Sequence, residues 1–246
     1  MLELYHWKPN AASARALIAL KEKGLEFRSH YVDVLALEQY APAFLDLNPL
    51  GQVPILIEDD EVLSEASYIG EYLDEAFPDP PLLPETPLDR WAARAWQKYV
   101  DDYLAAAVSA LAWPTLGLPA FRLGPAEIEP IPVKERRDQW QAALSGSDQG
   151  AQGKARERVR LTMERTEADL ETREWLAPGG FSLADIAVYA YLNYLPRIAS
   201  ELLGKRTAAW LDRVAARPAV KAAEAMGRSG DPYAISAPGP EPIRWG

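Results

Sequence analysis

Residues 48–54 read Asn-Pro-Leu-Gly-Gln-Val-Pro, and Glu-Ala-Ser follows at residues 65–67. Pro54 stands just before the strand-like segment 55–57, where a proline is a candidate for a cis peptide bond. Such a bond would leave the backbone N–H and C=O of Val53 facing outward, free to pair with a peptide ligand as an added strand does. Residues 65–67 begin a predicted helix, whose free N–H groups suit a carboxylate. Singly, each motif fits a plain loop end or helix cap, but together they predict a site for a peptide-like anion.

Short strand-like and helix-like segments alternate around this motif through the first 80 residues. A turn at Asp59-Asp60 makes the last two expected strands a hairpin, and a right-handed crossover makes the first two strands parallel. The order βαβαββα is thioredoxin-like, so we expect an α+β chain whose N-terminal domain spans residues 1–80. The expected strands are residues 2–6, 27–32, 55–57 and 61–63, and the expected helices are residues 13–23, which Gly24 stops, 37–45 and 64–76.

The pattern changes at residues 78–87, PDPPLLPETP, which hold five prolines. Proline stiffens a connection and cannot continue a helix, so we expect a linker over residues 81–87. An all-helical domain follows over residues 88–228, with helices at 88–111, 154–174, 183–195 and 208–216. Five prolines interrupt it at residues 113–153, which predicts an irregular insertion of a length that is often functional. Residues 229–246 are rich in proline and glycine and predict an extended tail.

Composition and charge exclude several classes of function. The 246 residues carry a net charge of −10, and residues 1–86 hold 16 acidic but only 5 basic side chains. This balance argues against nucleic-acid binding, which needs a basic face. The chain has no cysteine and only His6 and His30, which excludes disulfides, a protein thiolate and cysteine- or histidine-rich metal sites. No apolar run is long enough to span a bilayer and no signal peptide is visible, so we expect a cytoplasmic protein.

The chain resembles the cytosolic glutathione S-transferases over nearly its whole length. The resemblance implies a thioredoxin-like glutathione-binding domain, a helical domain that contributes the second substrate, and glutathione as co-substrate without metal, flavin or nucleotide. It also implies a dimer, of this chain alone or with a related one, in which the N-terminal domain of one protomer meets the C-terminal domain of the other. The residues that carry it are Leu4-Tyr5, Glu22-Lys23-Gly24, 44–54 (FLDLNPLGQVP), 65–73 (EASYIGEYL), 181–185 (FSLAD, with a Ser182–Asp185 capping box) and 210–218 (WLDRVAARP).

Within this family, three stretches are similar to the bacterial glutathione-dependent β-aryl etherases that cleave lignin-derived β-O-4 ethers. They are residues 4–24, residues 96–113 with the run WQKYVDDY, and the insertion with Pro130-Ile131-Pro132 followed by Trp140. This similarity implies that the glutathione thiolate displaces an aryloxy group from a β-aryl ether. Two alternatives stay open: a general or maleylacetoacetate-isomerase-like transferase, and a glutathione-fold binding protein without turnover.

The thiol of glutathione needs a donor that lowers its pKa. Serine-type members of the family place this donor just after the first strand, which corresponds here to residues 9–13. Asn10 lies nearest the usual serine position, and Ser13 is the hydroxyl residue of this turn and falls on a serine of the etherases. Asn10 and Ser13 are therefore the catalytic candidates, and the alternative role for Ser13 is that of a helix N-cap.

The resemblance also assigns binding residues. Ala66 departs from the family, which usually has a serine there, so only its backbone N–H remains for the γ-glutamyl carboxylate, and Ser67 is a substitute. The assigned glutathione contacts are Gln39, Gln52, Val53, Pro54, Glu65, Ala66 and Ser67, and the aromatic pocket candidates are Tyr99, Tyr103, Trp113, Phe121 and Trp140. For Arg136 and Arg137 we weigh contact with the glutathione carboxylates against solvation, and expect solvation.

Overall fold

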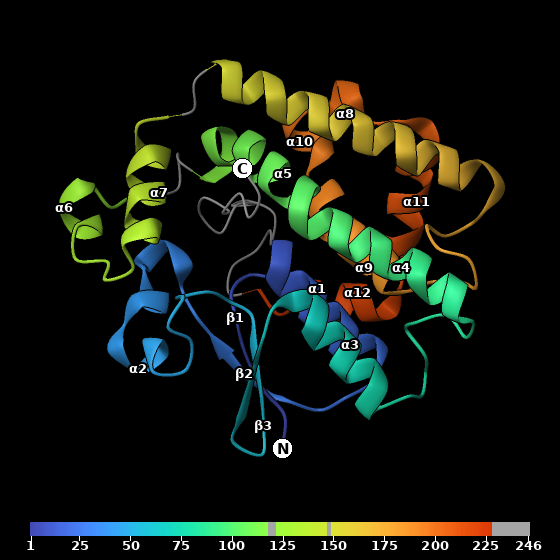
Figure 1. The fold of residues 1–246 in the computed structure, drawn as a ribbon, viewed down its shortest axis with the longest axis horizontal. Helices are drawn as coiled ribbons and strands as arrows, with labels where there is room; N and C mark the ends of the chain where they lie inside the picture. Colours follow the sequence, from blue (N-terminus) through green and yellow to red (C-terminus); the bar gives the residue numbers. More distant parts are fainter. Residues whose placement is uncertain (118–121, 147–148, 228–246) are drawn as a thin grey trace.

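The computed structural model of the chain describes residues 1–117, 122–146 and 149–227 (Figure 1). Strands β1 (Glu3–His6) and β2 (Arg28–Tyr31) are parallel, whereas β3 (Ile55–Glu58) runs antiparallel to both β1 and β4 (Glu61–Ser64). The parallel pair and the closing hairpin confirm the predicted thioredoxin-like topology. The order of the strands across the sheet is β2-β1-β3-β4.

The alternation of side chains along β1 places helices on both faces of the sheet. Leu4 belongs to the large apolar core that includes α1 (Ala11–Glu22) and α3 (Ala66–Ala76). Its neighbour Tyr5 points to the other face and packs beside α2 (Pro42–Leu45), in a smaller apolar cluster. Tyr5 is therefore a packing residue, which also stacks on the ring of His30.

The expected helix over residues 37–45 is wrong. Two short 3₁₀ turns, η1 (Val34–Ala36) and η2 (Glu38–Tyr40), replace most of it before α2 begins. Leu37 has a left-handed backbone with φ 62°, which breaks the helix between the two turns. Pro42 lacks an N–H and starts a new helix instead of continuing one.

The helical half begins with one continuous helical run that changes its winding three times. Thr86 caps its start by accepting from the N–H of Asp89 at 3.2 Å. The predicted single helix 88–111 therefore exists, but with a π-helical segment in its middle. The run comprises α4 (Pro87–Tyr99), the π-helical η3 (Val100–Leu104), α5 (Ala105–Ala112) and the π-helical η4 (Trp113–Gly117).

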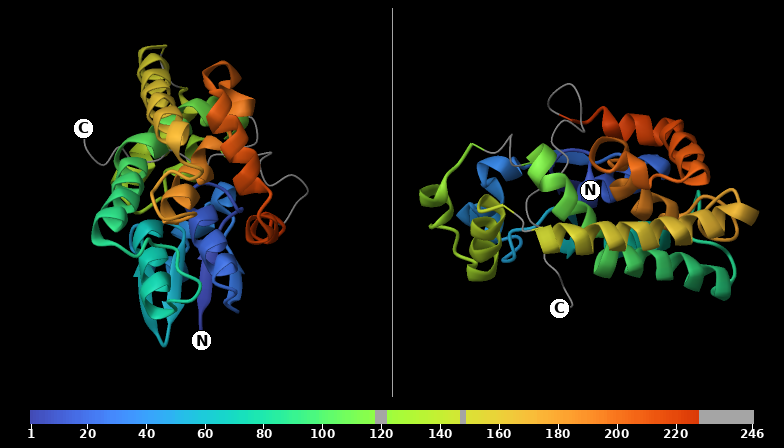
Figure 2. Two further views of the ribbon diagram at one scale, coloured as in Figure 1. Left: turned by 90° about the vertical axis from the view of Figure 1, so that its right-hand side faces the viewer. Right: turned by 90° about the horizontal axis from the view of Figure 1, so that it is seen from above.

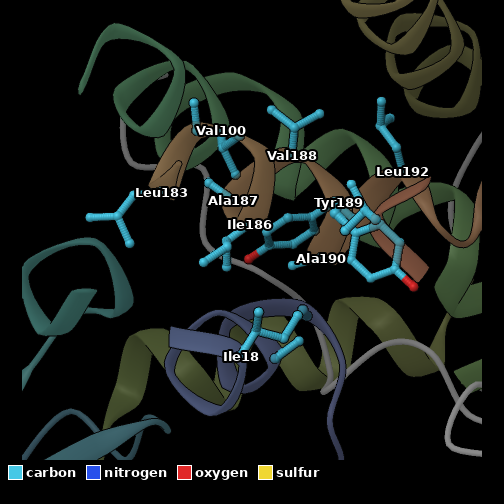
Figure 3. Packing of buried hydrophobic residues seen from close by; sticks show 14 of the residues in the cluster. Ile18, Val100, Leu183, Ile186, Ala187, Val188, Tyr189, Ala190 and Leu192 are labelled. Carbon is cyan, nitrogen blue, oxygen red and sulfur yellow. The ribbon is translucent and has the colours of Figure 1, made fainter. Parts of the chain in front are cut away.

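Helix α9 (Leu183–Leu192) lies at the centre, and all of its residues are buried. Figure 3 shows Ile18 of α1 pointing toward Ile186 and Ala190 of α9, so one apolar core joins the sheet half to the helical half. The long helix α8 (Gln149–Thr172) runs along α4 and α5 on the outside (Figure 2). The chain then continues through α10 (Leu195–Ile198), η5 (Ser200–Leu202), α11 (Lys205–Ala215) and α12 (Pro218–Glu224).

The insertion at residues 113–153 is more regular than expected. It contains α6 (Pro125–Ile128) and α7 (Lys134–Leu144), which lie beside the α2 region (Figure 1). Helix α7 buries little besides Trp140, so its sequence shows no broad apolar stripe from which a helix could be predicted. The expected tail at 229–246 lies outside the described residues. Over the described ranges, none of the helices has both the length and the apolar character that crossing a bilayer requires.

Candidate functional site

The loop before β3 is fixed by its own side chains. Asn48 Oδ1 accepts from the N–H of Leu50 at 3.1 Å, and Asn48 Nδ2 donates to the carbonyl of Gln52 at 2.9 Å. Gly51 has φ +60°, and a Cβ at this position would stand 2.5 Å from Cε1 of Tyr40. The loop therefore requires a residue without a side chain here, and the Tyr40 ring packs directly on its backbone.

Val53 borders a cavity, and its backbone N–H and C=O are available to bond a ligand there. The Val53–Pro54 peptide bond is cis, as predicted. Neither the N–H nor the C=O of Val53 bonds to another residue in the described part of the chain. Since Ile55 pairs with Ser64 in the hairpin, the antiparallel register places Val53 level with Ala66, where α3 begins.

Helix α3 starts two residues later than predicted, because Ser64 is still paired in β4. Glu65, the residue before the helix, has φ 70° and makes no side-chain cap. The first N–H groups of α3, those of Ala66 and Ser67, consequently have no intrahelical acceptor, and Ala66 lines the cavity. This is the helix start at which the sequence predicts an anion, and helix N-termini in general suit one.

Ser67 is engaged elsewhere. Its hydroxyl donates to Asp101 Oδ2 at 2.5 Å and accepts from the guanidinium of Arg15. Arg15 also forms an ion pair of 2.5 Å with Asp101 Oδ1, and the Arg15 side chain is only 4% exposed. The hydroxyl of Ser67 is therefore held in this network, which argues against its use as a substitute for the serine missing at Ala66.

Sequence reasoning missed Arg15 and Asp101. Arg15 is the one charged residue among residues 11–20 of an otherwise apolar and small-residue helix, which was a signal for a buried ion pair. Asp101 lies in the π-helical segment η3. Such segments are frequent at functional sites but have no strong sequence signature.

The two catalytic candidates lie at the start of α1. Asn10 is the N-cap residue, although its side chain makes no capping bond. Ser13 is the third helical residue, so the alternative role of Ser13 as N-cap is wrong; its Oγ instead accepts from the N–H of Trp7 at 3.1 Å. This bond uses a lone pair of the oxygen and leaves the hydroxyl proton to donate. The N–H of Ala11 donates across the core to the hydroxyl of Tyr194 at 2.9 Å.

The cavity lies between the loop before β3, the starts of α1 and α3, and the helices η3, α5, α7 and α9, and holds about 110 Å³. Ser13 and Asn10 are buried and are not among the residues that line it, whereas their neighbours Ala12 and Arg15 on the same helix line its wall. The predicted residues that line it are Gln39, Gln52, Val53, Pro54, Glu65, Ala66 and Trp140, and the lining residues that sequence reasoning did not assign include Arg15, Tyr40, Asp101 and Tyr191.

Two of the aromatic residues assigned to the pocket face α8 instead. The hydroxyl of Tyr99 is 3.1 Å from Thr162 Oγ1, and the Tyr103 ring lies 4.9 Å from the guanidinium carbon of Arg158. Burial raises the pKa of the Tyr99 hydroxyl, and the hydrogen bond to Thr162 offsets only part of this increase. Helical periodicity alone did not show which side of the α4–η3 run faces the cavity.

The insertion aromatics form a cluster of their own. Trp113 is buried, donates from Nε1 to the carbonyl of Ala143 at 3.1 Å, and meets Trp140 edge to face at 5.5 Å. Trp140 Nε1 donates to the hydroxyl of Tyr40 at 3.1 Å. Burial raises the pKa of Tyr40, and the bond from Trp140 offsets part of this. Trp140 thus lines the cavity, Trp113 packs behind it, and Phe121 lies outside the described residues.

Comparison with known proteins agrees with this fold. Residues 1–75 match the glutathione S-transferase N-terminal domain model, and residues 104–218 match the C-terminal domain model. The chain belongs to the glutathione S-transferase family. It is 36% identical to protein LigF of Sphingobium sp. SYK-6 over 89% of this chain and 91% of LigF. It is also 28% identical to glutathione S-transferase F10 of Arabidopsis thaliana, over 86% of this chain and 91% of that protein.

Solved structures show the same relationship. The crystal structure of the beta-etherase LigF superimposes with a TM-score of 0.84, 34% identity, and coverage of 90% of this chain and 98% of that one. Glutathione transferase F7 of Populus trichocarpa gives a TM-score of 0.70 at 26% identity, with coverage of 91% and 97%. The chain is accordingly a glutathione S-transferase-type enzyme.

In this glutathione S-transferase, both halves build the cavity. The N-terminal family domain supplies the loop before β3 and the starts of α1 and α3, and the C-terminal family domain supplies Ala105, Arg136, Trp140 and Tyr191. Asp101 falls between the two matched ranges. Among the residues described, no group of histidine, aspartate or glutamate side chains is arranged to hold a metal ion.

Proposed function

We propose that this enzyme cleaves β-aryl ethers with glutathione, its thiolate displacing an aryloxy group. The observation that carries the proposal is the likeness to LigF over nearly the full length of both chains, since LigF is a beta-etherase. The cavity supports it, because a backbone edge, a helix start and an acidic side chain meet there.

Glutathione would lie across the middle of this cavity. The N–H and C=O of Val53, which precedes Pro54, pair with the cysteinyl backbone, as in strand addition. The N–H groups at the start of α3, above all that of Ala66, receive the γ-glutamyl carboxylate. Glu65 binds the γ-glutamyl ammonium through a charge-assisted bond. Gln52 and Gln39 border the rest of the tripeptide.

Thiol activation is assigned to the start of α1. The hydroxyl of Ser13 keeps its proton for the sulfur, because its oxygen already accepts from Trp7. The helix dipole stabilises the thiolate at the same end, and Asn10 is the second donor. The ion pair of Arg15 with Asp101 holds α1 to η3 and so fixes this end of the helix.

The reaction needs little further chemistry from the protein. The sulfur of the thiolate attacks the carbon that bears the aryloxy group, a C–S bond forms and the C–O bond breaks with its electron pair leaving on the phenolate. A ketone on the adjacent carbon activates this displacement. The protein contributes the thiolate and the orientation of both reactants. Of the described aromatic residues assigned from sequence, Trp140 is retained as a cavity contact.

The test is an assay with both enantiomers of a β-aryl ether that carries the ketone, with and without glutathione. We expect release of the phenol together with an equal amount of the glutathione thioether, and a preference for one enantiomer. Conjugation of chloronitrobenzene without any ether cleavage would favour a general transferase. Binding of glutathione without turnover of either substrate would favour a carrier. The proposal retains two further expectations, a dimer and a cytoplasmic location.

A further inference from the structure

The insertion helix α7 closes one end of the glutathione cavity. Its Trp140 is hydrogen-bonded to Tyr40 of η2 and packs against Trp113. Arg137 donates to the carbonyls of Glu129 and Ile131 at 3.4 and 3.0 Å, which ties α7 to the turn before it. The position of α7 over the cavity is therefore set by Arg137 and Trp140, which both follow Arg136 on this helix.

Arg136 brings a positive charge to this end. It lines the cavity one helical turn before Trp140, so both side chains project from the same side of α7. Its guanidinium bonds to Gln139 Oε1 at 3.2 Å, and no carboxylate of the described residues forms an ion pair with it. The other arginine of the cavity wall, Arg15, is bound by Asp101. Arg136, expected to be solvated, is thus the cavity cation left for a ligand among the described residues.

The loop before β3 shows the order in which the surrounding groups line the cavity. Tyr40 packs on Gly51, whereas Val53 lies level with Ala66 at the start of α3. The groups around the cavity therefore follow one another from α7 and Tyr40, through Val53, to Glu65. A tripeptide with its middle residue on Val53 and its γ-glutamyl end on α3 directs its glycyl end toward α7.

Gln39, one of the glutathione contacts assigned from sequence, is a weaker partner for a carboxylate than an arginine. Gln39 is only 2% exposed. Its amide nitrogen donates to the carbonyl of Val34 at 3.4 Å, which leaves a single neutral N–H for a ligand, and its Oε1 can only accept. A carboxylate needs donors, and a guanidinium offers two in the matching geometry.

We propose that Arg136 of the insertion binds the glycyl carboxylate of glutathione and makes the enzyme selective for thiols that end in a free carboxylate. This inference rests on the proposed function of the cavity. With Glu65 for the ammonium and the start of α3 for the γ-glutamyl carboxylate, every charge of glutathione then meets an opposite charge or a helix dipole.

The test compares binding of glutathione with binding of its glycyl monoethyl ester, which lacks that negative charge, by titration calorimetry. We expect the wild type to bind glutathione about 10-fold to 100-fold more tightly than the ester, the range that one charge-assisted bond provides. Arg136→Ala should lose this preference by weakening glutathione binding and leaving ester binding unchanged. Arg136→Lys should retain part of the preference.

The matched control is Lys134→Ala. Lys134 lies on the same helix, is exposed and pairs with Asp138, so its loss removes a charge of the same sign away from the cavity. We expect it to keep the preference. Equal affinity of the wild type for glutathione and ester overturns the role of Arg136 and leaves the proposed function standing, as does an Arg136→Ala variant that weakens both ligands equally. A wild type that binds neither ligand overturns the proposed function itself.

Discussion

The carboxyl group of Asp185 receives hydrogen bonds from three segments of the chain. Its Oδ1 accepts from the N–H of Leu176 at 3.0 Å and from Nε1 of Trp210 at 2.9 Å, and its Oδ2 accepts from the N–H of Ser182 at 3.0 Å. Burial nevertheless dominates and raises the pKa of Asp185 to about 6. Because α9 starts here and packs against α1, this one residue ties the stability of the core to pH.

The sign of the pH dependence follows from the raised pKa. The unfolded chain has an aspartate pKa of about 3.9, so the folded state holds the proton more tightly between about pH 4 and pH 6. Ionisation of Asp185 over this range therefore costs stability, by up to about 3 kcal/mol. The Asp185→Asn variant cannot ionise, and its NH2 group would face N–H groups that donate to the carboxyl group in the wild type. We therefore expect the variant to have a lower free energy of unfolding than the wild type, and this gap between the two proteins should narrow as pH rises. Urea unfolding of both proteins at pH 4, 5 and 6.5 measures this gap, and a gap that is constant or widens contradicts the assignment.

At the same scale, the sequence predicted which chain positions line the cavity better than which side chains bond to one another there. Val53, Glu65 and Ala66 could be placed because a proline before a strand and a helix start are local patterns. The engagement of Ser67 with Arg15 and Asp101 joins three elements far apart in the chain, and no local pattern contains it.

At the scale of elements, strands and long amphipathic helices were predictable from their periodicity. The failures have physical causes: Leu37 adopts a left-handed conformation, and Ser64 is held in β4 by pairing with Ile55. Helix α7 buries mainly Trp140, so tertiary packing against Tyr40 places it, not an apolar stripe of its own. The element that covers the proposed glycyl end was therefore the one that sequence analysis described least well.

At the scale of the whole molecule, an apolar surface on α3 and α4 has no partner among the described residues. Tyr68, Leu88 and Trp91 are 71%, 73% and 67% exposed. The two helices are joined there by the Arg94–Glu71 ion pair of 2.8 Å. Exposed aromatic and aliphatic side chains on adjoining helices are typical of an interaction surface.

We expect this surface to support the dimer proposed from the family. Sedimentation velocity at micromolar concentration should give about twice the 27.3 kDa of one chain. Trp91→Glu should shift the protein toward the single-chain mass, because it places a charge in the apolar contact. Leu161→Glu, on α8, is the control and should leave the dimer intact. A wild type that sediments as a single chain contradicts the dimer.

The most direct test of the proposed chemistry is a titration of the ultraviolet thiolate absorbance of bound glutathione in the wild type and in Ser13→Ala, with thermal midpoints recorded alongside. We expect the thiol bound to the wild type to ionise well below the value of about 8.5 that is usual for a free cysteine thiol. Removal of the Ser13 hydroxyl should raise the pKa of the bound thiol by about one to two pH units, since a hydrogen bond to an ion contributes about 1.5–3 kcal/mol. A wild-type curve that matches free glutathione would contradict thiolate formation in this cavity. Identical curves for both proteins, with a lower midpoint for the variant, would instead assign Ser13 to holding Trp7 and leave activation to Asn10 or the backbone.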